Sequence, residues 1–547
     1  MSTLSPSHTP RPKLDSSVNL FSNFKEDFLA SIVVFLVALP LCIGIAVAVG
    51  VDPARALITG IIGGLIVGWF SGSPLQVSGP AAGLFVIVAD LIKEGEEIYP
   101  GSTDSAIDAQ AYALMVLGTS VFLAGVIQIV AGQLRLGQWF RAVSPAVVKG
   151  MLAGIGILIL LSQFHVMLDH KAMWHGEKAH GALQYLATIP EAIEKCFSPD
   201  TSANHHLAAL VGIIALACFV LWPKYSPKTL RFLPAALIGI LIATLFAIAT
   251  NLQVDFLTIP DNVLSEVTLP SASWVQLLWN PTVLVGAVVI AIIASAETLL
   301  CATAVDQMHQ GPRTKYDQEL SAQGVGNILC GLVGALPMTG VIVRSSANVS
   351  SGAKTRMSTI MHGGWLLLFV VAIPFVLTYI PRSALGALLV FTGFKLVNVK
   401  DIKALWQTSR GEIVVYLATV VMIIWTDLLM GVLVGIALSA LKVSVLSKVL
   451  VRPSNLRVRL ENSDNDQQAC LTLAGAATFM CIPKLAAELG RVQAGSELHV
   501  DFEQLTYIDH ACLELLNGWA SQHTNMGGGV VIDWETLQAR FASRAPS

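Results

Sequence analysis

Charged residues are scarce in this sequence. Of the 547 residues, 13% are Asp, Glu, Lys or Arg, which is about half of the roughly 25% that soluble proteins usually carry. The formal net charge is −3, and no basic stripe interrupts the low charge density. The composition therefore gives no indication of a nucleic-acid partner or of any other polyelectrolyte.

Patterns that mark enzymes, metal sites and secreted domains are also missing. Only Cys196 of the eight cysteines lies in a long polar loop, so there is no disulfide framework, and no CxxC or His/Cys spacing indicates zinc. The first 27 residues lack the apolar core of a cleaved signal peptide. No nucleophile and base are suitably arranged, so we expect neither an enzyme nor a bound cofactor beyond a coupling H⁺ or Na⁺.

Apolar residues, in contrast, make up 54% of the chain and are gathered into long runs. A helix needs about 20 such residues to cross roughly 30 Å of hydrocarbon. A soluble protein could not bury so many, so the sequence predicts an α-helical polytopic membrane protein. Clear runs are 28–50, 54–70, 112–131, 207–222, 232–250, 281–304, 360–380, 411–426 and 428–448.

The distribution of Lys and Arg predicts the topology. We count about 14 segments, including weaker ones near 80–92, 318–335 and 343–352, and place the N-terminus in the cytoplasm. The segment 251–280 then faces outward without any Lys or Arg, and 93–111 is acidic after Lys93. The positive-inside rule therefore predicts cytoplasmic N- and C-termini in the inner (plasma) membrane. The cytoplasmic connections carry Arg135, Arg141, Lys224, Lys228, Arg231, Arg313, Lys315, Lys354, Arg356, Lys395, Lys400, Lys403 and Arg410.

Two of the weaker stretches are interrupted in the same way. In 64–83 and in 327–346, a small or polar residue precedes a Gly by four positions, and a Pro follows that Gly by six. Interrupted apolar stretches in both halves of a chain are typical of inverted-repeat transporters, whose broken helices meet near the midplane of the membrane and direct their N-termini at an anionic substrate. Flexible loops or kinks without substrate contact are the alternative.

Two ionisable residues lie in these apolar surroundings, where a charge is costly and usually functional. Glu297 is deep in an apolar run, and Arg344 follows Gly340 by four residues. Across a cavity, Arg344 would attract an anion and Glu297 would bind a proton or cation. Neutralising that carboxylate would then couple the two. A structural ion pair between the two helices is the alternative.

Small residues and backbone N–H groups surround these positions and could hold an oxyanion. Pro80 suits a first helical turn, where its missing N–H costs nothing. We interpret Asp90, Gln128, Lys149 and Gln323 as packing or boundary residues. The candidate substrate-binding residues are Gln76, Ser78, Gly79, Ala81, Ala82, Gly83, Gly340, Arg344, Ser345 and Ser346.

The outward loop 164–206 is rich in histidine. Successive His residues about five positions apart would point roughly 140° apart on a helix, so we expect a solvated loop rather than a metal site. The residues concerned are His165, His170, His175, His180, His205 and His206.

The chain changes character after Leu450. Residues 455–547 alternate between strand and helix patterns, without a Gly-rich phosphate loop or a nucleophile elbow. We predict a polar N-terminal segment (1–27), a transport domain (28–450) and a small cytoplasmic α/β domain (455–547). The predicted elements are strands 456–461, 468–475, 497–502 and 528–533 and helices 482–492, 510–521 and 535–543.

The sequence resembles the SulP family of anion transporters over nearly its whole length. The resemblance is carried by the stretches 76–83, 337–340 and 344–348, by Glu297, and by a tail similar to a STAS domain. It implies two inverted seven-segment repeats forming core and gate domains, homodimers, and elevator-like alternating access. It also implies an anion held between the third and tenth helices: sulfate, bicarbonate, chloride or a dicarboxylate, often moved with Na⁺ or H⁺.

Departures from the family pattern refine this expectation. Residues 52–57 replace the signature of sulfate-type members, and 35–46 resemble the branch associated with carbonic anhydrase, so bicarbonate is favoured. Glu297 stands where sodium-coupled bicarbonate carriers have Asp, and Cys301 replaces a hydroxyl residue. These changes favour H⁺ over Na⁺ in a predicted coupling site of Glu297, Cys301 and Thr339.

The tail departs from the family pattern as well. STAS domains commonly place a phosphorylatable Ser or Thr after an Asp, whereas here His510 and Ala511 follow Asp509. Docking or assembly is therefore expected of this domain, and a phosphoswitch at that position is not.

The sequence thus predicts a secondary active transporter of a small inorganic oxyanion. A sulfate or dicarboxylate transporter or exchanger is one alternative, and a nucleobase permease of similar architecture is another. The third, from a different class, is a membrane sensor or scaffold that signals through the STAS-like domain.

Overall fold

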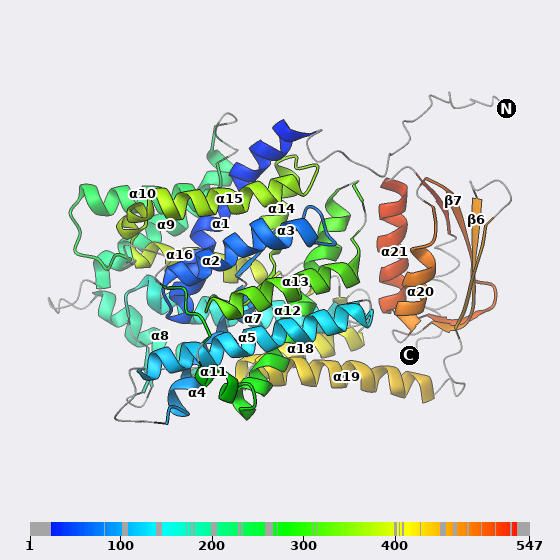
Figure 1. Cartoon of the computed structure of the whole chain (residues 1–547), viewed down its shortest axis with the longest axis horizontal. Helices are drawn as coiled ribbons and strands as arrows, with labels where there is room; N and C mark the ends of the chain where they lie inside the picture. Colours follow the sequence, from blue (N-terminus) through cyan, green and yellow to red (C-terminus); the bar gives the residue numbers. More distant parts are fainter. Residues whose placement is uncertain are drawn as a thin grey trace.

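The computed structural model describes residues 23–532, and the gaps within this range are short. They are 81, 101–107, 138–144, 171, 175–176, 179–180, 198–204, 228–229, 231–232, 258–265, 271, 310, 313, 399–401, 404, 407–409, 427, 449–455, 463–467, 478–480, 494, 509 and 526–527. A bundle of helices forms most of the molecule, and a smaller part containing a β-sheet lies at one end of the bundle (Figure 1).

The predicted apolar runs fall on helices, and the polytopic α-helical fold is confirmed. Six helical stretches in the described part are long and apolar enough to span a membrane, and shorter apolar helices accompany them. The run 360–380 is divided, because Pro374 begins a separate 3₁₀ turn (Pro374–Tyr379). The main helices are α1 (Phe24–Val49), α5 (Ala109–Gln133), α7 (Pro145–Met167), α9 (His205–Tyr225), α10 (Ala235–Ala249), α12 (Pro281–Met308), α15 (Met357–Ala372), α16 (Arg382–Leu396), α18 (Arg410–Trp425) and α19 (Leu428–Lys448).

The interrupted stretches form short helices that begin or end in the interior of the bundle. The first comprises α2 (Pro53–Ile62), a π-helical turn η1 (Gly63–Val67), α3 (Gly68–Phe70), strand β1 (Ser78–Pro80) and α4 (Phe85–Glu97). The second comprises α13 (Tyr316–Leu332), strand β4 (Met338–Gly340) and α14 (Ile342–Ser350). A helix α11 (Ala272–Leu277) precedes α12.

β1 and β4 pair with each other in an antiparallel two-stranded ribbon that we call the crossover. Ser78 is opposite Gly340, Gly79 opposite Thr339, and Pro80 opposite Met338. Segments about 260 positions apart in the chain therefore meet inside the bundle, as the matched interruptions predict.

Close contacts between glycines hold several helix pairs together. A methyl group at Gly125 of α5 would lie 2.6 Å from the Gly324 carbonyl oxygen of α13, and one at Gly324 would lie 2.7 Å from the Gly125 oxygen. Gly156 of α7 and Gly393 of α16 show the same reciprocity at 2.6 Å each way. Such contacts let membrane helices approach closely enough for van der Waals packing to stabilise them.

The loop between α7 and α9 contains an amphipathic helix, α8 (Ala182–Phe197), and a small hairpin of β2 (Met173–Trp174) and β3 (Glu177–Lys178). The rings of His165 and His170 lie 5.4 Å apart, and those of His170 and His205 6.3 Å apart. Folding thus brings together histidines that helical spacing alone would separate. Among the described residues, no group of three or more His, Cys, Asp and Glu is arranged to hold a metal; His175 and His180 lie outside the described residues.

The C-terminal part contains a five-stranded sheet with its own hydrophobic core. Its strands are β5 (Arg457–Asn462), β6 (Gln468–Ala477), β7 (Glu497–Asp501), β8 (Leu505–Ile508) and β9 (Gly529–Val531), and its helices are α20 (Ile482–Leu489) and α21 (His510–Asn525). Strands β6, β7 and β9 are parallel neighbours, while β5 is antiparallel to β6. Strand β8 was missed from sequence, and the predicted helix 535–543 lies outside the described residues. Helix α21 faces the helical bundle and contacts α12 (Figure 1).

Candidate functional site

The crossover is fixed by polar side chains from the surrounding helices. The N–H of Gly340 donates to Thr298 Oγ1 at 3.0 Å. The amide of Asn327 both accepts from the Met338 N–H at 2.8 Å and donates to the Met338 carbonyl at 3.2 Å. The backbone of β4 therefore has a defined position relative to α12 and α13.

Arg344 lies directly behind the crossover. Its side chain is fully buried, with 0% exposed, and a methyl group at Gly79 would lie 3.0 Å from the guanidinium carbon. Nη2 donates to Cys42 Sγ of α1 at 3.3 Å, while Nε and Nη1 have no hydrogen-bond partner. An uncompensated buried cation is very costly, so this guanidinium is suited to receive an anion.

Glu297 also lies beside the crossover. Its carboxylate is beside the Thr339 hydroxyl and the backbone N–H of Gly83, and a methyl group at Gly83 would lie 2.8 Å from Oε2. Oε2 itself is buried without a hydrogen-bond partner. Since Arg344 is directed at Cys42 instead, Glu297 and Arg344 do not form the structural ion pair that was the alternative interpretation.

The remaining residues of the predicted coupling site lie close to this carboxylate. Cys301 is one turn farther along α12 than Glu297, and its Sγ is 3.5 Å from Ser345 Oγ. The Thr339 hydroxyl is buried and has no hydrogen-bond partner. Thr339 of β4 thus places a hydroxyl oxygen beside Glu297, whereas Cys301 of α12 carries sulfur.

The predicted serines lie at different places around the crossover. Ser78 accepts a hydrogen bond from Gln323 Nε2 at 2.5 Å. Ser345 accepts from the Val77 N–H at 2.9 Å and donates to the Val341 carbonyl at 2.8 Å. Ser346 donates to the Val343 carbonyl of its own helix at 3.1 Å and is partly exposed, so the structure does not bring it to the crossover. Ala81 lies outside the described residues, as does the side chain of Ala82.

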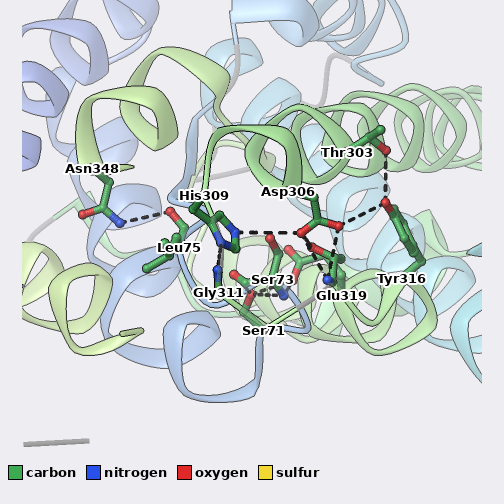
Figure 2. Close-up of polar contacts among 11 residues, drawn as sticks. Ser71, Ser73, Leu75, Thr303, Asp306, His309, Gly311, Tyr316, Glu319 and Asn348 are labelled. Carbon is green, nitrogen blue, oxygen red and sulfur yellow. Dashed lines mark hydrogen bonds and ion pairs between the residues drawn. The ribbon is translucent and has the colours of Figure 1, made fainter. Parts of the chain in front are cut away.

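A carboxylate that the sequence analysis overlooked holds this region together. Glu319 of α13 is fully buried and accepts from Ser71 Oγ at 2.6 Å, from the Ser73 N–H at 3.0 Å, from Gln76 Nε2 at 3.0 Å and from Gln323 Nε2 at 3.1 Å. Figure 2 shows Ser71 and Ser73 gathered around it. The rule that drew attention to Glu297 could have found it, because Glu319 is an acidic residue in the weakly apolar stretch 318–335.

A second polar cluster closes the turn between α12 and α13 next to Glu319. Asp306 accepts from the Thr314 hydroxyl at 2.7 Å and from Tyr316 Oη at 3.4 Å, and its Oδ1 lies 3.9 Å from His309 Nε2. Figure 2 shows Asp306 between His309 and Tyr316. This cluster links α12, which carries Glu297, to α13, which carries Glu319.

The residues interpreted as packing or boundary groups differ in their surroundings. Gln128 accepts from Asn327 Nδ2 at 2.8 Å and Gln323 bridges Glu319 and Ser78, so both support the crossover. Asp90 instead lines a cavity of about 440 Å³ between α4, α7, α8 and α18, whose other polar lining includes Gln184 and Thr426. Its α4 lining, Val86 and Asp90, belongs to the first half of that helix, the half nearer in sequence to the crossover.

These features define a class of protein: a membrane transporter in which two broken segments cross beside a buried, positively charged side chain, that of Arg344. The sulfate permease family model matches residues 24–419. The chain belongs to this family, and it is therefore an anion transporter of the membrane rather than an enzyme.

Similar proteins and structures agree with this assignment. The chain is 27% identical over 424 residues to a putative sulfate transporter of Bacillus subtilis, covering 76% of this chain and 73% of the relative. It is 24% identical over 428 residues to the bicarbonate transporter BicA of Picosynechococcus, covering 76% and 69%.

Two solved structures share the fold. The transmembrane domain of a cyanobacterial bicarbonate transporter BicA matches with a TM-score of 0.62 and 20% identity, covering 75% of this chain and 98% of that one. The murine Solute Carrier 26 family member A9 anion transporter, in an inward-facing state, matches with a TM-score of 0.63 and 17% identity, covering 95% and 87%.

Proposed function

We propose that this protein is a secondary active transporter of a small inorganic oxyanion, with bicarbonate favoured over sulfate. The observation that carries the proposal is Arg344, a fully buried guanidinium whose Nε and Nη1 lack partners. An oxyanion could accept hydrogen bonds from these groups and from backbone N–H groups near the crossover, which suits the chemistry of helix N-termini.

Coupling is proposed to involve Glu297 with Thr339 and Cys301. Glu297 Oε2 is buried without a hydrogen-bond partner, so a bound proton or cation would satisfy this oxygen. Cys301 contributes sulfur where an oxygen ligand would suit Na⁺. The donor set thus favours H⁺ over Na⁺.

The proposed movement is an elevator-like displacement of a core against a gate. We assign α4, α5 and α13 to the core and α7, α16 and α18 to the gate. Glycine contacts join α5 to α13 and α7 to α16, so the core and the gate could each move as one body. The cavity of about 440 Å³ lies between core helix α4 and gate helices α7 and α18, where an outer access path would be expected.

We further propose a homodimer in the plasma membrane with cytoplasmic termini, and a STAS-like role in docking or assembly for the C-terminal domain.

Two other functions remain as alternatives. Sulfate or dicarboxylate transport is supported by the putative sulfate transporter of Bacillus subtilis that the chain resembles. A sensor that signals through the C-terminal domain is supported by the contact between α21 and α12, the helix that carries Glu297. Transport of bicarbonate is preferred because a BicA protein is similar both in sequence and in fold.

Uptake into proteoliposomes tests the proposal. Labelled bicarbonate and sulfate are offered under separate Na⁺ and pH gradients, with the pH clamped to correct for CO₂ that crosses the bilayer unaided. We expect the wild type to concentrate bicarbonate under one gradient, Arg344→Gln to take up neither anion, and Glu297→Gln to lose the dependence on the gradient.

A matched control variant is His206→Gln, which changes an exposed residue at the start of α9 and should behave as the wild type. Uptake of sulfate but not of bicarbonate would show that the substrate is sulfate and that the preference for bicarbonate is wrong. Binding without uptake, in protein that remains folded, would favour the sensor.

A further inference from the structure

A second buried nitrogen base lies close to Arg344. His362 is in the second turn of α15, with 0% of its side chain exposed. Neither Nδ1 nor Nε2 has a hydrogen-bond partner. A neutral imidazole normally donates from one nitrogen and accepts at the other when buried, so His362 lacks both of its usual contacts.

The packing of α15 brings this part of the helix close to Arg344. The next residue, Gly363, is in close contact with Gly64 of η1, where a methyl group on Gly64 would lie 2.5 Å from the Gly363 Cα. One turn earlier, a methyl group at Gly60 would meet Leu366 of α15 at 2.9 Å, Cys42 at 3.2 Å and Arg344 Nη1 at 4.0 Å. Helices α1, α2, α14 and α15 therefore converge on the guanidinium.

On these surrounding helices, Arg344 is the residue whose positive charge interacts electrostatically with the imidazole of His362. The same charge interacts with the thiol of Cys42. Glu297 packs against Gly83 and is not among the groups whose charge acts on His362. Two charged residues on the packed helices are engaged elsewhere: Asp27 of α1 accepts from Lys354 and Thr355, and Arg55 of α2 pairs with Glu266. In the described part of the chain, His362 thus faces one positive charge and no carboxylate.

We propose that His362 is a second anion-binding residue and that it takes up one proton together with the anion. In the empty site, a proton on His362 would place a second positive charge beside Arg344 in a buried region, which is unfavourable. An anion on Arg344 offsets that repulsion, so the free imidazole nitrogen accepts a proton from water and donates its N–H to the anion. On release, the proton leaves with the anion.

This inference rests on the proposed function, because it requires an anion at Arg344. It adds to that function a proton carrier that is separate from Glu297. If His362 were only a packing residue, its protonation would not change when an anion binds. The two possibilities differ in a quantity that can be measured without transport.

Isothermal titration of the purified full-length protein with sulfate, in buffers of different ionisation enthalpy, gives the number of protons taken up per anion bound. Sulfate is chosen because it takes up no proton itself near neutral pH; if it does not bind, bicarbonate is used and its own ionisation is subtracted. Near pH 7 we expect His362→Gln and His362→Asn to take up about one proton fewer per anion than the wild type, whose total also includes any proton that binds at Glu297. The anion affinity of these variants should fall about tenfold at pH 6 and change less at pH 8.

His206→Gln is the control, and it should take up as many protons per anion as the wild type. Anion binding to wild type without proton uptake overturns the inference, and this result does not depend on whether any variant folds. Proton uptake by folded His362→Asn that equals that of the wild type also overturns it. Failure of both anions to bind the wild type, by contrast, contradicts the proposed function itself.

Discussion

Buried polar side chains near the crossover fall into two groups. Glu319 accepts hydrogen bonds from four donors, and Asn327 is bonded to the backbone of β4 through both ends of its amide. Arg344 and His362 instead retain nitrogens without partners, and Glu297 retains an oxygen. Burying an unpaired polar group costs about 1–3 kcal/mol, so the first group supports the structure and the second is open to ligands.

Replacing Glu319 with Gln should destabilise the protein more than its small change in shape suggests. The new amide NH₂ would face donors from Ser71, Gln76 and Gln323, and each donor left unpaired costs about 1–3 kcal/mol. We expect a clearly lower Tm of the detergent-solubilised protein. Ser346→Ala, on a partly exposed side chain, serves as the control, and an unchanged Tm for Glu319→Gln would show that the carboxylate does not organise the crossover.

At the scale of helices, glycine contacts set the distances between neighbours. The contacts between α5 and α13 recur every seven residues: Gly118 meets Gly331, and Gly125 meets Gly324. Seven residues are close to two turns, so these glycines lie on one face of each helix. The two helices are antiparallel and touch along their backbones.

Gly125→Ala is expected to weaken this pair. Its methyl group would lie 2.6 Å from both the Gly324 carbonyl oxygen and the Ile328 nitrogen, so the backbones would have to separate, at a cost of about 1–3 kcal/mol. Gly364→Ala on α15 is the matched control, because its methyl group would have only a Leu65 carbon at 4.0 Å. Thermal unfolding should show a lower Tm for Gly125→Ala alone. Equal Tm values for the two variants would mean that α5 and α13 can separate without penalty.

The elements themselves were predicted better than their contacts. Apolar runs fixed the long helices, and the matched interruptions predicted that 64–83 and 327–346 meet. Glu319 could have been singled out as an acidic residue in an apolar stretch, but its contact with Gln76 could not, because the two lie 243 positions apart in the sequence. His362 could not be singled out, because only its folded surroundings near Arg344 distinguish it. The grouping of His165, His170 and His205 likewise depends on how α8 and the hairpin fold back. Local patterns cannot specify such distant contacts.

The whole molecule shows pairings that an inverted repeat of seven segments would produce. The reciprocal contact of α5 with α13 has a counterpart in that of η1 with α15, through Gly64 and Gly363. When the seven predicted segments of each half are numbered in order, each of these two contacts joins the second segment of one half to the fourth segment of the other half. The crossover likewise joins the third segment of each half. The repeat itself stays a prediction, and these contacts are the kind that it requires.

The predicted topology can be tested with native cysteines on opposite ends of the molecule. Cys196 of α8 is expected outside the cell and Cys470 of β6 inside. A membrane-impermeant maleimide should label Cys196 in intact cells and Cys470 only after permeabilisation, with Cys196→Ser and Cys470→Ser identifying each signal. Burial raises the pKa of the Cys196 thiol, so its thiolate fraction is low at neutral pH and labelling should accelerate as the pH rises. Labelling of Cys470 in intact cells would reverse the topology.

If Arg344 and Glu297 belong to one moving body, as proposed above, their burial has an electrical consequence. With Glu297 ionised, their charges cancel, so the empty carrier would cross the membrane field at no cost. Bicarbonate bound with one proton on His362 also adds no net charge, whereas sulfate with one proton adds one negative charge. Moving that charge inward against a negative interior costs about 2.3 kcal/mol per 100 mV. The resting voltage of the cell would therefore favour the monovalent anion even if both anions fitted the site equally well.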